Sequence, residues 1–198
     1  MESPELLELD MRLGRRLKAT RQARGMTLDQ LSERSGVSRA MISRVERGES
    51  SPTAALLDRL CAGLGIVLSA LFHDEHGAGP LARKGEQPVW TDPASGYLRR
   101  AVSPAASGSN IEIVEVAMPA GARVLLEAPR SGYRLDQQLW LLEGELVIGV
   151  GGREHRLAAG DCLAMLLDGP ISFHNPGAEP ARYAVVLTAA DAWNGISR

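Results

Sequence analysis

The chain has 198 residues, of which 44% are hydrophobic, and a formal net charge of −2 at pH 7. This length allows one or two domains with cores of their own. The N-terminus is acidic and no stretch approaches the roughly 18 apolar residues of a membrane span, so we expect neither a signal peptide nor a membrane partner. The cysteine count of 2 is too low for a disulfide framework and favours a cytoplasmic location.

The near-neutral total conceals an uneven distribution of charge. Residues 11–72 contain 11 Lys and Arg against 5 Asp and Glu, a balance of +6. Residues 1–10 and residues 73–198 each have a balance of −4. Because Lys and Arg neutralise backbone phosphates, a basic region between two acidic ones is typical of a nucleic-acid-binding module. The expected organisation is an acidic N-terminal extension over 1–10 and a basic domain over 11–72.

Residues 27–48, TLDQLSERSGVSRAMISRVERG, have the pattern of two short helices joined by a tight turn. Thr27 and Ser38 are predicted N-caps, since each hydroxyl can accept a hydrogen bond from the following first turn. Gly36 stands where the turn needs a positive φ, and Gly48 ends the second helix. The buried faces are predicted from apolar residues at helical spacing, which are Leu28, Leu31, Ile42 and Val45.

This segment resembles the helix-turn-helix of the phage-repressor (Cro/C1-type, XRE) family, and the similarity runs from about Leu13 to Phe72. The resemblance implies an all-α, five-helix domain, with a fourth helix starting at Pro52 and Thr53 and a short fifth over 67–72. It also implies that Arg21, late in the first helix, pairs with Glu46, at the end of the second motif helix. The alternative is a small helical bundle that contacts other proteins.

The resemblance implies double-stranded DNA as the partner, with the second motif helix in the major groove. Gln30 is the expected contact to the DNA backbone, by analogy with the family. Arg39, Ser43 and Arg44 are the candidates for base contacts, because an arginine can read guanine. Contact with phosphate or simple solvation is the alternative for each arginine. The full predicted DNA-binding set is Thr27, Gln30, Ser38, Arg39, Ala40, Ser43 and Arg44.

Residues 73–88, HDEHGAGPLARKGEQP, have the composition of a linker. His73 and His76 flank two acidic residues, which is one pattern of a metal site. A solvated linker is the favoured interpretation, because ordering a flexible segment around a metal has a large entropic cost.

From residue 89 the pattern changes to short strands separated by Gly, Pro and Asp, which predicts an all-β sandwich or barrel. The segment 111–118, IEIVEVAM, alternates apolar and polar residues as a half-buried strand does. Two apolar runs around Gly144 suggest a hairpin. The segment 95–104, SGYLRRAVSP, is expected to pair at the sheet edge or across a dimer, with Arg99 or Arg100 directed inward. The other predicted strands are 138–143, 145–150, 154–157, 162–166, 171–174 and 183–188.

Three phrases, PAGARVLLEA, LWLLEGELVIGVGGREHRLAAGDCLAM and HNPGAEPARYAVVL, resemble a cupin over about residues 105–190. The predicted fold is therefore an all-α helix-turn-helix domain followed by an all-β cupin, a double-stranded β-helix or jelly roll, over 89–198. Metal-binding cupins carry His-x-His, a Glu and a further His as ligands. Here those positions hold residues 130–133 (RSGY), Gln137 and about Ile171, while His174 would face away. We expect no metal and no cofactor.

A cupin without a metal still has a pocket, which is expected to be mostly apolar with a few polar groups. Strand alternation directs Gln137, Leu139 and Leu141 inward, and Gln138 and Trp140 outward. An inward arginine would favour an anionic ligand such as a carboxylate, although surface or dimer positions explain the arginines equally well. The predicted pocket residues are Arg123, Tyr133, Gln137, Leu139, Met165 and Arg182.

The two resemblances together imply a sequence-specific DNA-binding regulator, expected to be a repressor rather than an enzyme. Its homodimer would bind a twofold-symmetric operator and respond to a small molecule in the cupin pocket. A different function is an iron enzyme like hydroxypropylphosphonate epoxidase, which joins the same two modules but needs metal ligands that we expect this sequence to lack. A further alternative is a binding protein with a vestigial DNA module, or an antitoxin-like partner.

Overall fold

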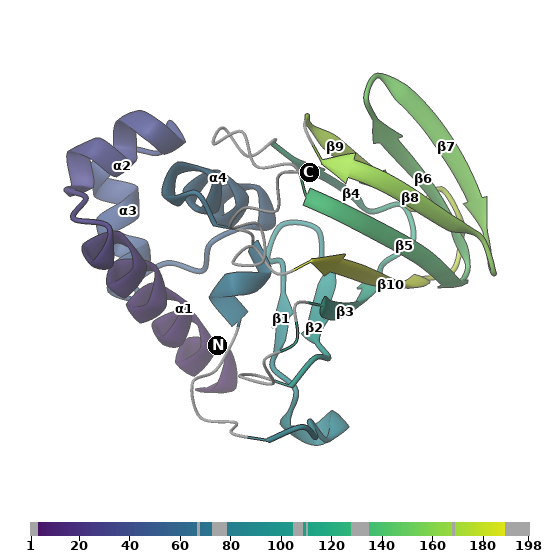
Figure 1. The fold of residues 1–198 in the computed structure, drawn as a ribbon, viewed down its shortest axis with the longest axis horizontal. Coiled ribbons are helices and arrows are strands. Elements are labelled where there is room, and N and C mark those ends of the chain that lie inside the picture. The colour runs from purple at the N-terminus through teal and green to yellow at the C-terminus, as the bar shows by residue number, and fades with distance from the viewer. Residues whose placement is uncertain are drawn as a thin grey trace, which may run out of the picture.

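A computed structural model of the protein describes residues 4–66, 68–72, 79–104, 109, 111–127, 135–167 and 169–188. These residues form a helical half and a β half, and helix α4 (Ala54–Leu64) lies beside the β half (Figure 1). Among the described helices, none has the length and apolar character needed to cross a membrane.

The helical half begins with α1 (Pro4–Ala23), followed by the motif helices α2 (Leu28–Ser35) and α3 (Arg39–Glu46) and then by α4. The predicted fifth helix over 67–72 is instead a 3-10 helix, η1 (Leu68–Phe72), so the described part of this half has four α-helices. A segment this short forms about one turn, which favours 3-10 geometry.

Helix α1 starts within the segment 1–10, which the charge distribution had marked as an extension. Pro4 suits the first turn of a helix, because its missing N–H would have no partner there. Asp10 is buried and its carboxylate accepts a hydrogen bond from the Ser51 hydroxyl. At least the end of the acidic segment therefore belongs to the helical half.

Glycines permit close approaches between the helices. At Gly63 of α4, a Cβ would lie 3.0 Å from Cδ1 of Leu31 and 3.0 Å from Cβ of Ser35, both on α2. Helices α2 and α4 are thus in direct contact at this point, and any side chain larger than hydrogen would push them apart.

The β half contains two antiparallel sheets, with strand orders β1-β2-β3-β10-β5-β8 and β4-β9-β6-β7. From β3 onward the chain crosses from one sheet to the other after every strand except β6, which pairs with β7 in the same sheet, and the eight strands form a jelly roll; β1 and β2 extend the first sheet. Their bounds are β1 Val89–Thr91, β2 Leu98–Ala101, β3 Ile111–Met118, β4 Arg123–Leu126, β5 Leu135–Glu143, β6 Glu145–Val150, β7 Arg153–Ala158, β8 Cys162–Leu167, β9 Ile171–His174 and β10 Ala181–Thr188.

The hairpin predicted at Gly144 is wrong. Strand β5 pairs with β10 and β8, whereas β6 pairs with β7 and β9 in the other sheet. Gly144 has φ 82°, and a Cβ there would lie 2.9 Å from Cα of Ala181, so a glycine allows the chain to turn from one sheet to the other. The hairpin lies one strand later, between β6 and β7 at Gly151 and Gly152.

Strand β2, in the segment 95–104, pairs with β1 and with β3 at the edge of its own sheet.

The helical and β halves share one continuous hydrophobic core. The rings of Phe72 and Trp90 lie 5.8 Å apart across the boundary, measured between centroids. The carboxylate of Asp92, just after β1, accepts a hydrogen bond from the backbone N–H of Ala54 at 2.9 Å, and this bond is buried.

Candidate functional site

The corner between α2 and α3 is built by local hydrogen bonds. Thr27 Oγ1 accepts a bond from the N–H of Gln30 at 3.1 Å, and Gln30 Oε1 accepts one from the N–H of Thr27 at 2.8 Å. Ser38 Oγ accepts a bond from the N–H of Met41 at 3.3 Å. Gly36 ends α2 with φ 67°, a left-handed conformation that glycine adopts readily. These caps fix where each motif helix begins and how sharply the chain turns between them.

An ion pair joins the end of α1 to the end of α3. Arg21 donates from Nε to Glu46 Oε1 at 2.6 Å and from Nη2 to Glu46 Oε2 at 2.8 Å. Both residues are buried, and the hydrogen bonds to Glu46 raise the pKa of Arg21 above its usual value. Arg21 also donates to the carbonyl of Met26 at 2.7 Å, just before the Thr27 cap. One guanidinium therefore fixes α3 relative to α1 and to the start of α2.

The outward face of α3 carries the predicted base-contacting residues. Ile42 and Val45 are buried in the core, whereas Arg39 and Arg44 are exposed. Ser43 is half-buried and accepts a hydrogen bond from Arg47. The remaining predicted DNA-binding residues are all exposed, namely Thr27, Gln30, Ser38 and Ala40. This face can present two guanidinium groups on a rigid helix to an anionic partner.

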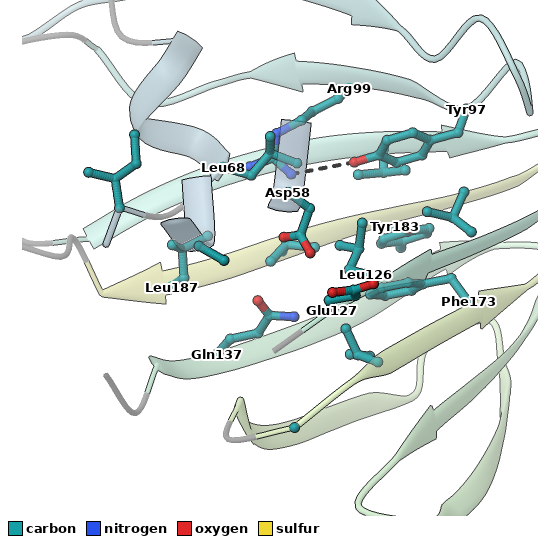
Figure 2. A pocket seen from close by; sticks show the side chains of 17 residues that line it. Asp58, Leu68, Tyr97, Arg99, Leu126, Glu127, Gln137, Phe173, Tyr183 and Leu187 are labelled. Atoms are coloured by element: carbon teal, nitrogen blue, oxygen red, sulfur yellow. Dashed lines mark hydrogen bonds between the residues drawn. The ribbon is translucent and has the colours of Figure 1, made fainter. Parts of the chain in front are cut away.

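A cavity lies between α4 and the β half. Its wall on the helical side includes Asp58 and Ala62 of α4, and its β walls include Phe173, Tyr183 and Leu187 (Figure 2). The rings of Phe173 and Tyr183 stack with their centroids 6.1 Å apart. The walls are predominantly apolar, with a few polar groups, as is common in binding sites for small molecules.

Besides two tyrosines, the polar side chains that line this cavity among the described residues are Asp58, Arg99, Glu127 and Gln137. Figure 2 shows Asp58 and Gln137 reaching into the same space from α4 and from β5. The pKa of Asp58 is raised to about 7, because burial and the nearby Glu127 carboxylate, which raise it, outweigh the Glu127 backbone N–H bond and Arg99, which lower it. Asp58 Oδ2 is buried without a hydrogen-bond partner among the described residues.

Arg99 of β2 is the most buried cation in the cavity wall, with 8% of its surface exposed. Nη1 donates to the Tyr97 hydroxyl at 3.4 Å, and the guanidinium carbon lies 5.8 Å from the centre of the Phe72 ring. Within the described residues, Nε has no hydrogen-bond partner. Neighbouring Arg100 faces the other way and lies 3.3 Å from a Glu115 carboxylate oxygen.

Of the residues predicted for the pocket, Gln137 lines the cavity. Leu139 and Met165 are buried on the inner side, and Gln137 Nε2 donates to the Met165 sulfur at 3.6 Å. Tyr133 lies outside the described residues. Arg123 and Arg182 do not line the cavity, because their neighbours Val124 and Tyr183 occupy the inward positions and side chains alternate along a strand. Arg182 instead binds Glu115 and Glu143.

Asp58 and Glu127 were not among the predicted pocket residues. A signal for Asp58 exists in the sequence, because Ala54, Asp58 and Ala62 are four residues apart and share one face of an apolar helix. An acidic residue on such a face has to meet a partner, a cavity or solvent. Recognising the cavity would also have required knowing that α4 packs against the β half.

The cavity's residues do not match the ligand set of metal-binding cupins. The sequence analysis places Gln137 at the position of the Glu ligand and about Ile171 at that of the second-motif His, and both residues line the cavity, whereas residues 130–133 lie outside the described residues. His174 follows the inward Phe173 and therefore lies on the opposite side of β9. Among the described residues, no group of three or more His, Cys, Asp or Glu is placed to hold a metal ion.

Comparison with known proteins gives matches over the helical half and over nearly the whole chain. Residues 17–70 match the helix-turn-helix family HTH_3. The HTH-type transcriptional regulator SutR of Escherichia coli K12 is 26% identical over 167 residues, which are 84% of this chain and 89% of the relative. PuuR, an HTH-type transcriptional regulator of the same organism, is 25% identical over 166 residues, covering 83% of this chain and 88% of the relative.

The crystal structure of an HTH_3 family transcriptional regulator from Vibrio cholerae matches with a TM-score of 0.75 at 25% identity. The match covers 92% of this chain and 97% of that chain. The arrangement of a helix-turn-helix half beside a jelly roll is therefore common to both structures.

Proposed function

We propose that this chain, whose residues 17–70 form a helix-turn-helix domain of the XRE type, is a transcriptional regulator that binds double-stranded DNA in the cytoplasm. The observation that carries the proposal is the exposed face of α3, with Arg39 and Arg44 on a helix fixed by the Arg21–Glu46 pair. The names of SutR and PuuR, which match along most of the chain, support the same function. Repression is the expected mode.

Footprinting of the purified chain on DNA upstream of its own and neighbouring genes tests this function. We expect a protected site with two half-sites about one helical turn apart, each read by one recognition helix. We also expect affinity to fall steeply with salt, because the basic helical half displaces counterions from phosphates. Absence of any protected site would favour the alternative of a vestigial DNA module or an antitoxin-like protein.

We propose a homodimer that forms through the outer surface of the six-stranded sheet. This outer apolar face comprises Ile111, Ile113, Trp140, Ala184 and Val186, on three neighbouring strands. Ile113 is opposite Val186, and Trp140 is opposite Ala184. Ile111, Ile113 and Trp140 are all exposed, and a contiguous exposed apolar surface favours a protein–protein interface. Two identical apolar faces are complementary under twofold symmetry.

Sedimentation of Trp140→Arg tests the proposed interface. We expect the wild-type chain to sediment as a dimer and the variant as a monomer, because a buried unpaired charge is costly. Leu125→Arg is the matched control, since Leu125 is 57% exposed against 52% for Trp140 but lies on the other sheet. Dissociation by Leu125→Arg alone would place the interface on the opposite face.

We further propose that a small-molecule effector occupies the cavity between α4 and the β half. A ligand there touches α4 on one side, and α4 meets α2 at Gly63 on the other. Binding can therefore change the placement of the motif helices relative to the β half. The effector changes DNA affinity only to the extent that it binds the two arrangements differently.

An iron enzyme of the hydroxypropylphosphonate epoxidase type is the less favoured function. That chemistry needs two His ligands and one carboxylate, whereas the corresponding positions here include Gln137 and Ile171. We propose that the chain is not an enzyme and uses no cofactor. Metal analysis of the purified chain provides the test, and stoichiometric iron would contradict the proposal.

A further inference from the structure

We propose that the cavity between α4 and the β half binds a small zwitterion with an apolar body, such as an amino acid. Its ammonium group would bind Asp58 of α4, and its carboxylate would bind Arg99 of β2. This inference rests on the proposed function, because it names the ligand class of the proposed effector site. It also goes beyond that function, because it makes the helical half a direct part of the ligand site.

The first step concerns Arg99. A buried guanidinium without an anion lowers the stability of the folded chain, because it has lost most of its hydration. Only 8% of the surface of Arg99 is exposed. Among the described residues, no carboxylate forms an ion pair with it, and its Nε has no hydrogen-bond partner. The Tyr97 hydroxyl and the Phe72 ring compensate for only part of that loss. A ligand carboxylate can accept hydrogen bonds from such a fork with good geometry.

The second step concerns Asp58, which lines the same cavity from the opposite half of the molecule. Its Oδ2 is buried and accepts no hydrogen bond from any described residue. Asp58 and Arg99 do not pair with each other, although both face the cavity. Burial raises the pKa of Asp58 despite the opposing effect of Arg99, and no described cation contacts its buried Oδ2. A ligand ammonium group would supply that contact.

The third step concerns the charged side chains and the apolar side chains that line the cavity. Among the described residues, two carboxyl side chains, Asp58 and Glu127, and one guanidinium, Arg99, line the cavity. A ligand with only a negative charge would meet both carboxyls, and a ligand with only a positive charge would leave Arg99 unpaired. A zwitterion can pair its ammonium group with Asp58 and its carboxylate with Arg99. Between them, Phe173, Tyr183 and Leu187 offer an apolar surface for the body of the ligand.

Such a ligand would bridge the two halves of the molecule. Asp58 moves with α4, which contacts α2 at Gly63, whereas Arg99 belongs to β2, the strand next to the edge strand β1 of the six-stranded sheet. The ion pair between the ligand ammonium group and Asp58 and the ion pair between the ligand carboxylate and Arg99 would together set the distance between α4 and that sheet. Ligand binding would then act directly on the helical half through Asp58.

Thermal unfolding of the full chain with matched probes tests the inference. The probes are the standard amino acids and, for each apolar one, the amine without the carboxylate and the acid without the amine. For leucine these are isopentylamine and 4-methylpentanoate. We expect at least one apolar amino acid to raise the unfolding temperature more than either counterpart, because a ligand that binds only the native state stabilises it.

Three results would overturn the inference. The first is that no amino acid raises the unfolding temperature. The second is that an amine is as effective as its amino acid, which would mean that Arg99 is not used. The third is that an acid is as effective, which would mean that Asp58 is not used.

Variants assign the two ends of the ligand. Asp58→Asn keeps the shape but removes the charge, and we expect it to weaken amino-acid binding by roughly tenfold or more while sparing the acid counterpart. Arg99→Gln should weaken amino-acid binding similarly while sparing the amine. Arg100→Gln is the matched control, because Arg100 is on the same strand but pairs with Glu115 outside the cavity. Equal binding by wild type and Asp58→Asn would overturn the assignment even if Arg99→Gln fails to fold.

The proton balance gives a second readout. Titration calorimetry at pH 7 in buffers of different ionisation enthalpy should show proton release, because an ammonium group stabilises the ionised form of Asp58. Proton uptake would overturn the inference. Footprinting without added ligand separates failure of this inference from failure of the proposed function. Protected DNA with no response to amino acids would contradict only the zwitterion site. Amino-acid binding without protected DNA would contradict only the proposed regulator function.

Discussion

The recognition helix and the interdomain cavity both present arginines, but in opposite surroundings. Arg39 on α3 has 66% of its side chain exposed, with the exposed Asp29 carboxylate 3.6 Å away. Arg99 in the cavity is buried and has no carboxylate partner among the described residues. An exposed charge costs little while it waits for a partner, whereas a buried one lowers stability until it is paired. The exposed arginines of α3 therefore cost little stability before a partner binds, whereas the buried Arg99 lowers stability until an anion pairs with it.

The largest predicted effect on stability comes from breaking the buried ion pair between Arg21 and Glu46. Glu46→Ala leaves the Arg21 guanidinium buried against α3 without its anion. We expect a loss of about 3–5 kcal/mol in the free energy of unfolding, measured by urea denaturation. Glu49→Ala is the control, because the Glu49–Arg47 pair is exposed, and it should not change the free energy measurably. Equal effects of the two variants would mean that burial does not distinguish these pairs.

The next effect concerns the pH dependence of Asp58, which faces Glu127 and Arg99. Its pKa is about 7 in the folded chain and 3.8 in the reference state, so the folded chain holds the proton more tightly. Its contribution to stability is therefore fully present below pH 4 and is lost as pH rises to about 7. The loss amounts to at most about 4 kcal/mol.

Asp58→Asn should remove this slope and be more stable than the wild type at pH 7 and above. Urea denaturation of both chains between pH 4 and pH 8 gives the difference, which cancels the contributions of other titrating groups. A difference that stays constant over this range would show that Asp58 is not buried in the way described.

A smaller effect is expected on the recognition helix. Arg39→Ala should leave stability unchanged and relax sequence preference at one operator position, at a cost of about 1–3 kcal/mol on the preferred sequence. Binding to a set of single-base operator variants measures this. A uniform loss on every sequence would instead make Arg39 a phosphate contact, with a smaller dependence of affinity on salt.

The smallest effect is expected for Arg182, an arginine that belongs to neither site. It binds Glu115 and Glu143 in a half-exposed network outside the cavity. Arg182→Ala should change neither the thermal unfolding temperature nor the response to amino acids. A lost response would place Arg182 in the ligand site, as the sequence analysis had predicted.

The local parts of the structure could be predicted from the sequence because short-range chemistry determines them. Thr27, Gly36 and Ser38 define the caps and the turn by their own backbone and side-chain preferences. The jelly roll followed from strand patterns and from the cupin resemblance. The sheet crossing at Gly144 was missed, since two apolar runs around a glycine look the same whether they pair or separate.

The cavity was harder to predict because its charged residues come from segments far apart in the chain. Asp58, Arg99 and Glu127 meet only when α4 packs against the jelly roll. The register shift between Arg182 and Tyr183 also makes side-chain direction difficult to count along β10. Gln137 was correctly placed inward because its strand alternates regularly through Leu139 and Leu141.

Asp92 limits how freely such regulators can exchange their parts during evolution or in the laboratory. It follows a strand of the jelly roll, yet it accepts a hydrogen bond from the first N–H of a helix in the helical half. A recombination point placed in the linker over 73–88 would separate that helix from its acceptor and leave Phe72 without Trp90. A working chimera would need the donor jelly roll to bring both an acidic residue and an aromatic residue to these two places, so the junction between the halves is inherited as a unit.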